Sequence, residues 1–370
     1  MDFKKHKLGE FIDTISETST IKKQQVVLIN TSDVENGKVL NHKYTENKNL
    51  KGQFKKRFRK DDILYSEIRP KNKRFAYVDF DASDYIASTK LMVLRNKGNI
   101  DNTFLYQLLK SNKIINQLQL LAESRSGTFP QITFNELANV EIEIPNIENQ
   151  IKISEILTDI DSKIEINNQT NDNLLKIGLE LLKEDFNKKT EYEVLSNAIK
   201  FVKGKKPLDI TPEIKEKYKK YLTIACLNGQ ELNYADPTKM ILSNNDLLMV
   251  MDGASSGDVY YVGQGIVGST LSRVDCIDGN YISEFIYFIM KYYKDLIQSK
   301  NTGSAIPHTD KVFVGNLKVP KLLIEEQEKY KTLLYKILKN MNENKILEQL
   351  RDTLLPKLMN GEIDLDKIEI

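Results

Sequence analysis

The chain repeats its own pattern at a constant offset of 177 residues. The matched pairs are Pro130 and Pro307, Gln150 and Gln327, Leu157 and Leu334, Ile160 and Ile337, Ile164 and Met341, and Asn167 and Asn344. A period of this length is the size of a whole domain and is too long for a solenoid unit. The sequence therefore predicts a tandem duplication, with two globular modules that are each followed by a long helix.

The helices are predicted from apolar residues that alternate three and four positions apart, which is typical of a coiled-coil seam. A helix from Gln150 to Asp185 would be roughly 50 Å long. The seam positions are Leu157, Ile160, Ile164, Asn167, Asn171 and Leu174 in the first helix, and Leu334, Ile337, Met341, Asn344 and Leu347 in the second. Matching seams favour antiparallel pairing, with the modules at opposite ends. The alternative is two unrelated amphipathic helices that each cover their own module.

The modules themselves read as mixed α and β, so the predicted fold class is α+β with pseudo-two-fold symmetry. The predicted parts are a first module (1–148), a central helix (149–189), a second module (190–322) and a C-terminal helix (323–370). Strands are predicted at 62–68, 90–94, 140–144, 246–251 and 317–320, and helices at 103–121 and 283–297. Pro356 is predicted to break or kink the last helix.

Composition excludes several classes of protein. Two cysteines and three histidines are too few and too scattered for a His/Cys metal cage, so no metal site is predicted. No apolar run has the length of a membrane span, which predicts a cytoplasmic protein without a membrane partner.

Two motifs suggest catalysis but lack the required context. Gly253 to Gly257 matches the G-x-S-x-G nucleophile elbow, and Gly263 to Gly268 matches the dinucleotide-binding G-x-G-x-x-G. Both motifs must lead into a helix, whereas strand-like sequence follows each of them. We therefore predict a glycine- and serine-rich hairpin turn at 253–257 and no catalytic centre.

Basic residues cluster locally although the net charge is only +2. Such clusters can neutralise phosphates, and short hydroxyls or arginine forks can reach base edges. The candidate DNA-contacting residues are Lys55, Lys56, Arg57, Arg69, Lys71, Lys73, Arg74, Arg125, Lys203, Lys205, Lys206, Ser255, Ser256 and Arg273. The alternative is a solvated lysine-rich face. Ser255 and Ser256 have no clear counterpart in the first half.

Several motifs, taken in order, resemble the specificity subunit of type I restriction-modification enzymes. In the first half they are Asp62 to Pro70, Gly127 to Ile132, Ile144 and Pro145, and Glu148 to Leu157. In the second they are Asn245 to Leu248, Gly303 to Pro307, Glu325 to Gln327 and Leu350 to Ile363. Together they span nearly the whole chain. The second copy departs from the first because Pro320 to Gln327 is two residues longer than Pro145 to Gln150, which predicts a different angle between the second module and its helix.

The resemblance implies two target-recognition domains that read a bipartite double-stranded DNA site, with the helices setting the gap between the two half-sites. It also implies docking of two methyltransferase subunits and of restriction subunits, with S-adenosylmethionine, ATP and Mg on those partners and no cofactor on this chain. It transfers no base-contacting residue. A free-standing enzyme, either a methyltransferase or a serine hydrolase using Ser255, and a coiled-coil scaffold without DNA contact remain as alternatives.

Overall fold

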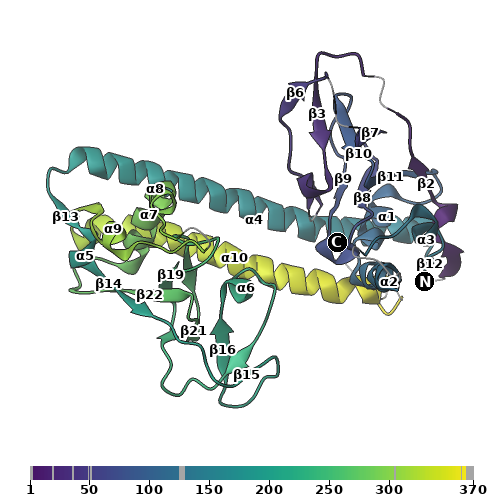
Figure 1. Ribbon diagram of the computed structural model, residues 1–370. Coiled ribbons are helices and arrows are strands. Elements are labelled where there is room, and N and C mark those ends of the chain that lie inside the picture. The colour runs from purple at the N-terminus through teal and green to yellow at the C-terminus, as the bar shows by residue number, and fades with distance from the viewer. Residues whose placement is uncertain are drawn as a thin grey trace. The chain divides into compact units, whose positions relative to one another are not determined.

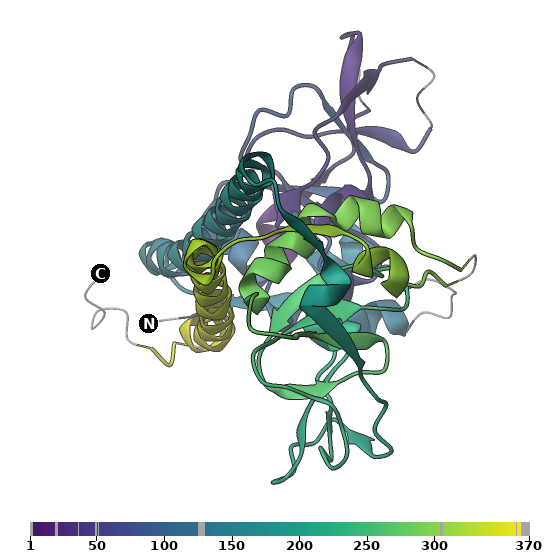
Figure 2. The ribbon, with the colours of Figure 1, turned by 90° about the vertical axis from the view of Figure 1, so that its left-hand side faces the viewer.

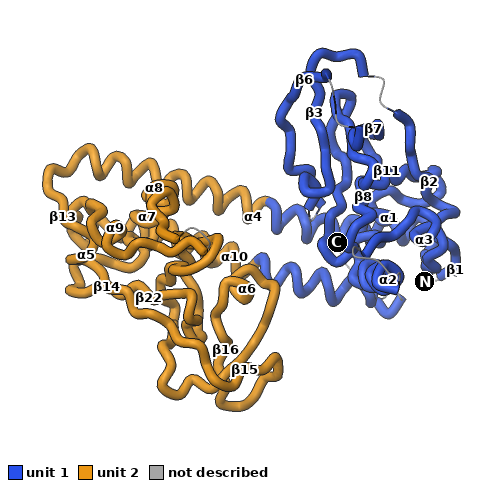
Figure 3. The backbone as a smooth tube through the Cα atoms, in the orientation of Figure 1, with its two compact units in different colours: residues 1–165, 344–370 blue, residues 166–343 orange. Residues whose placement is uncertain are grey.

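The computed structural model describes residues 3–18, 21–35, 37–48, 50, 52–124, 130–303, 306–359 and 361–363. The chain forms two compact units (Figure 3), one of residues 1–165 with 344–370 and one of residues 166–343. Two long helices, α4 (Ile147–Lys188) and α10 (Ile324–Met359), each contribute one part to unit 1 and the other part to unit 2 (Figure 1). Both are close to the predicted helices, and α10 continues through Pro356 to Met359 instead of ending at the proline.

Unit 1 is built mainly from short strands followed by three helices. In chain order its elements are β1 (Lys4–Lys7), η1 (Leu8–Glu10), β2 (Ile12–Ile15), β3 (Gln25–Ile29), η2 (Thr31–Asp33), β4 (Val34–Glu35), β5 (Lys38–Val39), β6 (Tyr44–Glu46), β7 (Phe54–Arg57), β8 (Ile63–Ser66), η3 (Pro70–Asn72), β9 (Phe75–Tyr77), β10 (Tyr85–Ser88), β11 (Leu91–Asn96), α1 (Asn102–Leu109), α2 (Asn112–Glu123), α3 (Phe134–Ala138) and β12 (Glu141–Ile144). The single helix predicted over 103–121 is wrong. Ser111 ends that run and caps α2 by accepting a hydrogen bond from the Ile114 amide.

The central sheet of unit 1, in the order β2-β11-β8-β9, is buried on both faces. Successive residues of a strand point to opposite faces. Ile63 and Tyr65 therefore pack against the core that includes α1 and α2, while Leu64 packs against the second sheet, β6-β3-β10-β7. Burial on both sides explains why β8 reads as a continuous apolar run rather than an alternating one.

Unit 2 repeats this element order. Its elements are β13 (Tyr192–Val194), α5 (Leu195–Ala198), β14 (Ile199–Lys203), β15 (Ile210–Thr211), β16 (Lys219–Leu222), α6 (Ile224–Leu227), β17 (Tyr234–Ala235), β18 (Leu242–Ser243), β19 (Asp246–Val250), β20 (Val259–Val262), β21 (Gly265–Val267), β22 (Leu271–Cys276), α7 (Ser283–Tyr292), α8 (Lys294–Ser299), α9 (Lys311–Gly315) and β23 (Lys318–Pro320). The helix predicted over 283–297 is again two helices, α7 and α8.

The strand pairings of the two units correspond closely. The first strand pairs antiparallel with the last in each unit, as β1-β12 and as β13-β23. The central sheets have the equivalent orders β2-β11-β8-β9 and β14-β22-β19-β20. The central sheet of unit 2 is also buried on both faces, because Leu247 and Met249 face the helices whereas Leu248 and Val250 face the second sheet. The duplication seen in the helical sequence thus extends through the folded modules.

Within unit 2, α4 and α10 lie side by side (Figures 1 and 2) and run antiparallel. The Asn167 amide donates to Glu343 at 3.0 Å, Asn340 donates to Asn171 at 2.9 Å, and Lys329 pairs with Asp185 at 2.7 Å. Partner numbers on α10 fall as those on α4 rise, which is the signature of an antiparallel pair.

Most predicted seam positions do face inward. Leu157, Ile160, Asn167, Leu334, Ile337 and Asn344 are buried, and Ile164, Asn171, Leu174 and Leu347 are half-buried. Met341 is an error of the prediction, since its side chain is 47% exposed. Asn340 faces Asn171 instead, because a three-residue step from Ile337 brings the amide into hydrogen-bonding range.

A buried glutamine side chain ties the start of each long helix to its own unit. In unit 1, Gln150 donates to the Pro145 carbonyl at 2.9 Å and accepts from the Asp101 amide at 2.9 Å. In unit 2, Gln327 donates to the Leu322 carbonyl at 3.0 Å and accepts from the Ile282 amide at 3.0 Å. Each glutamine reaches the carbonyl five residues before it. The two extra residues after Pro320 therefore precede these hydrogen bonds and do not alter them. The angle expected to differ at this joint stays a prediction.

Gly178 of α4 packs directly against Phe288 of α7 in unit 2. A Cβ atom at position 178 would lie 2.1 Å from Phe288 Cε1, and Phe288 is fully buried. The aromatic ring has no solvent-side space into which it could move.

We expect Gly178→Ala to lower the free energy of unfolding by about 1–3 kcal/mol through overpacking. This outcome is opposite to helix propensity, which favours alanine by about 1 kcal/mol. Urea denaturation followed by circular dichroism measures the change. Lys176→Ala, at an exposed position of the same helix, is the control and should stay within about 0.5 kcal/mol of the parent. A stabilised Gly178→Ala variant would contradict the assigned packing.

Asp161 of α4 forms a charged network within unit 1. Its carboxylate pairs with Lys110, the C-cap residue of α1, accepts from Gln107 at 3.0 Å and accepts from Arg351 of α10 at 2.9 Å. Burial pushes the pKa of Asp161 upward, but Lys110, Gln107 and Arg351 together outweigh burial and lower that pKa below its usual value.

We expect Asp161→Asn to cost on the order of 2 kcal/mol at pH 7, because it leaves Lys110 without its anion and leaves Arg351 with Asp352 alone. The folded pKa lies below the unfolded one, so this stabilisation is present above about pH 4 and is lost as the pH falls through the folded pKa. Denaturation curves at pH 7 and at acid pH should show the difference between parent and variant shrinking. Asp159→Asn, at an exposed position of the same helix, is the control; a pH-independent difference would refute the assignment.

Candidate nucleic-acid interface

The edge strand β7 of unit 1 carries three consecutive basic residues that do not share one environment. Lys55 and Arg57 are exposed, whereas Lys56 between them points to the opposite face of the sheet. Its ammonium donates to the Leu91 carbonyl at 2.8 Å and lies 3.9 Å from Glu67. Burial lowers the pKa of Lys56. Lys56 is therefore a structural lysine, which corrects its prediction as a DNA contact.

The turn 69–73 connects β8 to β9 and concentrates positive charge. Arg69 and Lys71 are exposed, and Lys73 is half-buried. Arg69 and Lys73 both have left-handed backbones, with φ of 45° and 51°. Arg74, which follows the turn, donates from its guanidinium to the Thr31 carbonyl at 3.1 Å and is also half-buried. Three of these four side chains belong to the turn itself, whereas the Arg74 side chain contacts Thr31 of η2.

Sequence reasoning missed two residues beside this turn. Gln131 forms an isolated antiparallel bridge with Ile68 at the end of β8. Lys90 donates to the Gln131 side chain at 3.1 Å and lies 3.6 Å from Glu67, with half of its own side chain exposed. In the sequence, Gln131 matches His308 at the repeat offset of 177 residues. No sequence pattern connected Gln131 with Lys90. Arg125 lies outside the described residues, as do 127–129 and 304–305 of the turn motifs.

The turn 253–257 of unit 2 joins β19 to β20 as a hairpin, as predicted, so the strand after it excludes a nucleophile elbow. Ser255 is half-buried on this turn. The Ser256 side chain is completely buried, and its hydroxyl donates within the unit to the carbonyls of Gly253 at 2.7 Å or Pro307 at 2.8 Å. The prediction of Ser256 as a DNA contact is corrected, since its hydroxyl supports the turn from inside.

Three lysines gather where β14 ends. Lys203, Lys205 and Lys206 are exposed, and Lys203 lies 3.9 Å from Asp252 at the base of the turn 253–257. Gly204 between them is required by close packing, because a Cβ atom there would lie 2.2 Å from the Gly268 carbonyl oxygen. His308, which sequence reasoning did not select, has half its side chain exposed and its Nδ1 2.7 Å from Asp252.

Arg273 lies on β22, and all three nitrogens of its guanidinium donate a hydrogen bond within unit 2. It binds Asp275 through two bonds of 2.7 and 3.0 Å and donates to the Leu242 carbonyl at 2.6 Å. Its hydrogen bonds to Asp275 raise the pKa of Arg273. The prediction of Arg273 as a DNA contact is corrected, because the side chain cross-links two strands of its own unit.

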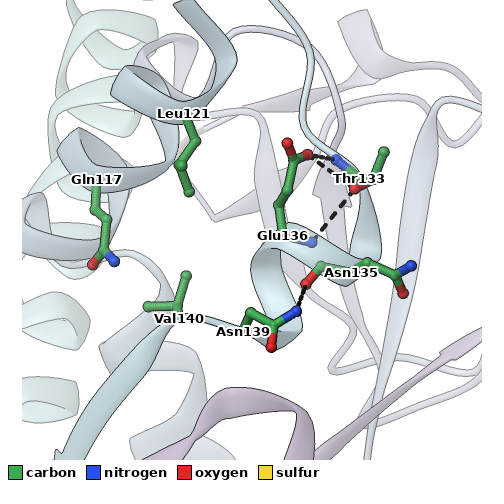
Figure 4. A pocket seen from close by; sticks show the side chains of 7 residues that line it. All are labelled: Gln117, Leu121, Thr133, Asn135, Glu136, Asn139 and Val140. Atoms are coloured by element: carbon green, nitrogen blue, oxygen red, sulfur yellow. Dashed lines mark hydrogen bonds between the residues drawn. The ribbon is translucent and has the colours of Figure 1, made fainter. Parts of the chain in front are cut away.

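The described residues show little that could support catalysis. No group of three or more His, Cys, Asp or Glu side chains among them could hold a metal ion. A pocket of about 550 Å³ between α2 and α3 (Figure 4) is lined mostly by amide and apolar side chains. Its only charged lining residue, Glu136, accepts hydrogen bonds from the Thr133 amide and hydroxyl as the capping box of α3. No described helix is long and apolar enough to cross a membrane.

Comparison with known proteins places this arrangement in a family. Residues 1–176 match a family described as the type I restriction modification DNA specificity domain. The HindI specificity subunit of Haemophilus influenzae is 30% identical, with 98% of this chain and all of that protein covered. The MjaIX specificity subunit of Methanocaldococcus jannaschii is 23% identical, with 77% of this chain and 76% of that protein covered.

One solved structure supports the fold. The crystal structure of a type I restriction-modification S subunit from M. genitalium aligns with a TM-score of 0.54 and 18% identity, over 97% of this chain and 96% of that one. Two modules of equivalent topology, two long helices and sequence similarity over nearly the whole length of a curated relative agree. The chain therefore belongs to the specificity subunits of type I restriction enzymes, which are the non-catalytic members of those systems.

Proposed function

We propose that this chain gives a type I restriction-modification complex its DNA sequence specificity by reading a bipartite double-stranded site, one half with each unit. The observation that carries the proposal is the repeated hairpin that leaves the central sheet of each unit, with exposed cations at or beside it. These are Arg69 and Lys71 in unit 1 and Lys203, Lys205 and Lys206 in unit 2. Such cations can neutralise phosphates, and an arginine or lysine can also reach base edges in a groove.

The two long helices supply the proposed docking surface for the partner subunits. Several large apolar side chains on them are exposed within their own units: Ile166, Ile177, Tyr335 and Met341 in unit 2, and Ile151, Ile346 and Leu350 in unit 1. Exposed apolar side chains gathered on helices are typical of protein interfaces. We propose that two methyltransferase subunits and the restriction subunits assemble on this chain in the cytoplasm, and that S-adenosylmethionine, ATP and Mg are bound by those partners.

The alternation along β7 yields a test of the DNA interface. We expect Lys55→Ala with Arg57→Ala to weaken binding to all DNA sequences and to lower the slope of log affinity against log salt by roughly 0.9 for each phosphate that is no longer neutralised. Fluorescence anisotropy over a salt series measures the slope. Lys56→Ala is the matched control and should leave the slope unchanged. An unchanged slope in the double variant would remove β7 from the interface.

Methylation mapping tests the function as a whole. Plasmid DNA from cells that express this chain with its methyltransferase subunit should carry a split motif methylated in both halves, and the motif should vanish without this chain. Long-read sequencing identifies the motif. If the same methyltransferase works with another specificity subunit but yields no motif with this one, the chain is a scaffold without DNA contact.

A further inference from the structure

The turns 69–73 and 253–257 occupy the same place in the two units. The hairpin β8–β9 pairs Ile63 with Tyr77, and the hairpin β19–β20 pairs Leu247 with Tyr261. Leu247 and Tyr261 thus each lie 184 positions after their equivalents, Ile63 and Tyr77. At the 177-residue offset of the helices, Ser255 and Ser256 have no clear counterpart in the first half. At the 184-residue offset of the strand register, they align with Lys71 and Asn72.

The backbones of the two turns also agree. The first and last residues are left-handed in both, with φ of 45° and 51° at Arg69 and Lys73 and of 107° and 93° at Gly253 and Gly257. The amide of the first residue donates to a proline carbonyl in both, to Pro130 at 3.1 Å and to Pro307 at 2.9 Å. The two turns therefore share their first hydrogen bond and the sign of φ at both ends. They differ at the last residue, where the Lys73 amide donates to Pro70 but the Gly257 amide donates to Val250, and they carry different side chains.

The two turns differ in the type of residue at their two left-handed positions. Glycine adopts a left-handed backbone without steric cost, whereas a residue with a Cβ atom is strained there and persists only where the surroundings hold it. Unit 2 has glycine at both positions. Unit 1 has Arg69 and Lys73 instead, so its turn keeps two long cationic side chains despite the strain.

The turn 69–73 is held rigidly from below. The Asn72 amide donates to Arg69 at 2.8 Å, the Lys73 amide donates to Pro70 at 2.9 Å, and the Lys71 amide donates to the buried Gln119 side chain of α2 at 3.1 Å. Pro70 is buried and has no amide hydrogen. The backbone donors of this turn are thus occupied within the unit. A turn ordered before binding loses little conformational entropy on binding.

We propose that Arg69 and Lys73 read base edges in the half-site bound by unit 1, and that the equivalent glycines of unit 2 do not. This inference rests on the proposed DNA-recognition function and adds residue-level specificity to it. Arginine and lysine pair with the O6 and N7 acceptors of guanine in the major groove. The half-site of unit 1 accordingly contains at least one G·C pair recognised by this turn.

The test replaces Arg69 and Lys73 by the residues that unit 2 carries. In the full chain with its methyltransferase, Arg69→Gly with Lys73→Gly should relax one half of the methylated motif at one or two base pairs and leave the other half intact. Discrimination against the substituted base pair should fall by roughly 5- to 150-fold, the range expected when one bidentate pair of hydrogen bonds to a base is removed. The melting temperature should stay the same or rise, because glycine relieves the backbone strain.

Two further variants sharpen the result. Arg69→Lys keeps the charge but removes the planar fork, and should relax the same position. Lys4→Ala with Lys5→Ala removes two cations from β1 of the same unit and should leave the motif unchanged. An intact motif in the glycine variant, or an equal loss of affinity for all sequences, would overturn the inference by making these residues phosphate contacts or none. Absence of any split motif with the parental chain would instead refute the proposed function.

Discussion

The arrangement of each unit depends on one buried amide side chain at the start of its long helix. Gln150 and Gln327 are 3% and 0% exposed, and each bonds both the segment before its helix and the loop that precedes α1 or α7. An unsatisfied buried amide is costly, so donor and acceptor must both find partners, and only one placement of the helix start satisfies them. In both units the glutamine side chain donates to the carbonyl five residues before it and so joins the module to its helix.

The two units share the framework of their central sheets and differ in the side chains of the turn that this framework exposes. The order of the central sheet, the pairing of the first strand with the last and the positive φ at both ends of the turn after β8 and β19 are shared. The side chains on that turn change from arginine and lysine to glycine, alanine and serine. A frame buried on both faces of its central sheet tolerates few changes, because core volume and register must be preserved. The exposed turn carries no such constraint, so two units of one fold can present different recognition surfaces.

Patterns of local origin were predicted well from the sequence. Helix α4 begins and ends within two residues of the predicted span 149–189, α10 begins one residue after the predicted 323, and the strands at 63–66, 246–250 and 318–320 fall inside the predicted runs. The errors share a cause. Lys56, Ser256 and Arg273 were grouped by residue type as DNA contacts, but each is engaged by atoms from a distant part of its unit: the Leu91 carbonyl, the Pro307 carbonyl and the Leu242 carbonyl. The prediction of Met341 as a seam residue was wrong for another reason. The inward-facing positions of α10 shift by one residue there, which exposes Met341 and turns Asn340 inward.

The sequence by itself determined the duplication, the two helices with their inward faces and the α+β class, because periodicity and repetition are properties of residues close together or at constant offset. The family was indicated separately, by the resemblance of its motifs. Tertiary structure decided which of the clustered cations are available, that Asp161 and Gln150 tie the helices to their units, and that the turns 69–73 and 253–257 are equivalent. Those facts depend on strand register and on which face of a strand each side chain takes. Register is set by pairing between segments far apart in the chain, and a shift of one residue reverses every face.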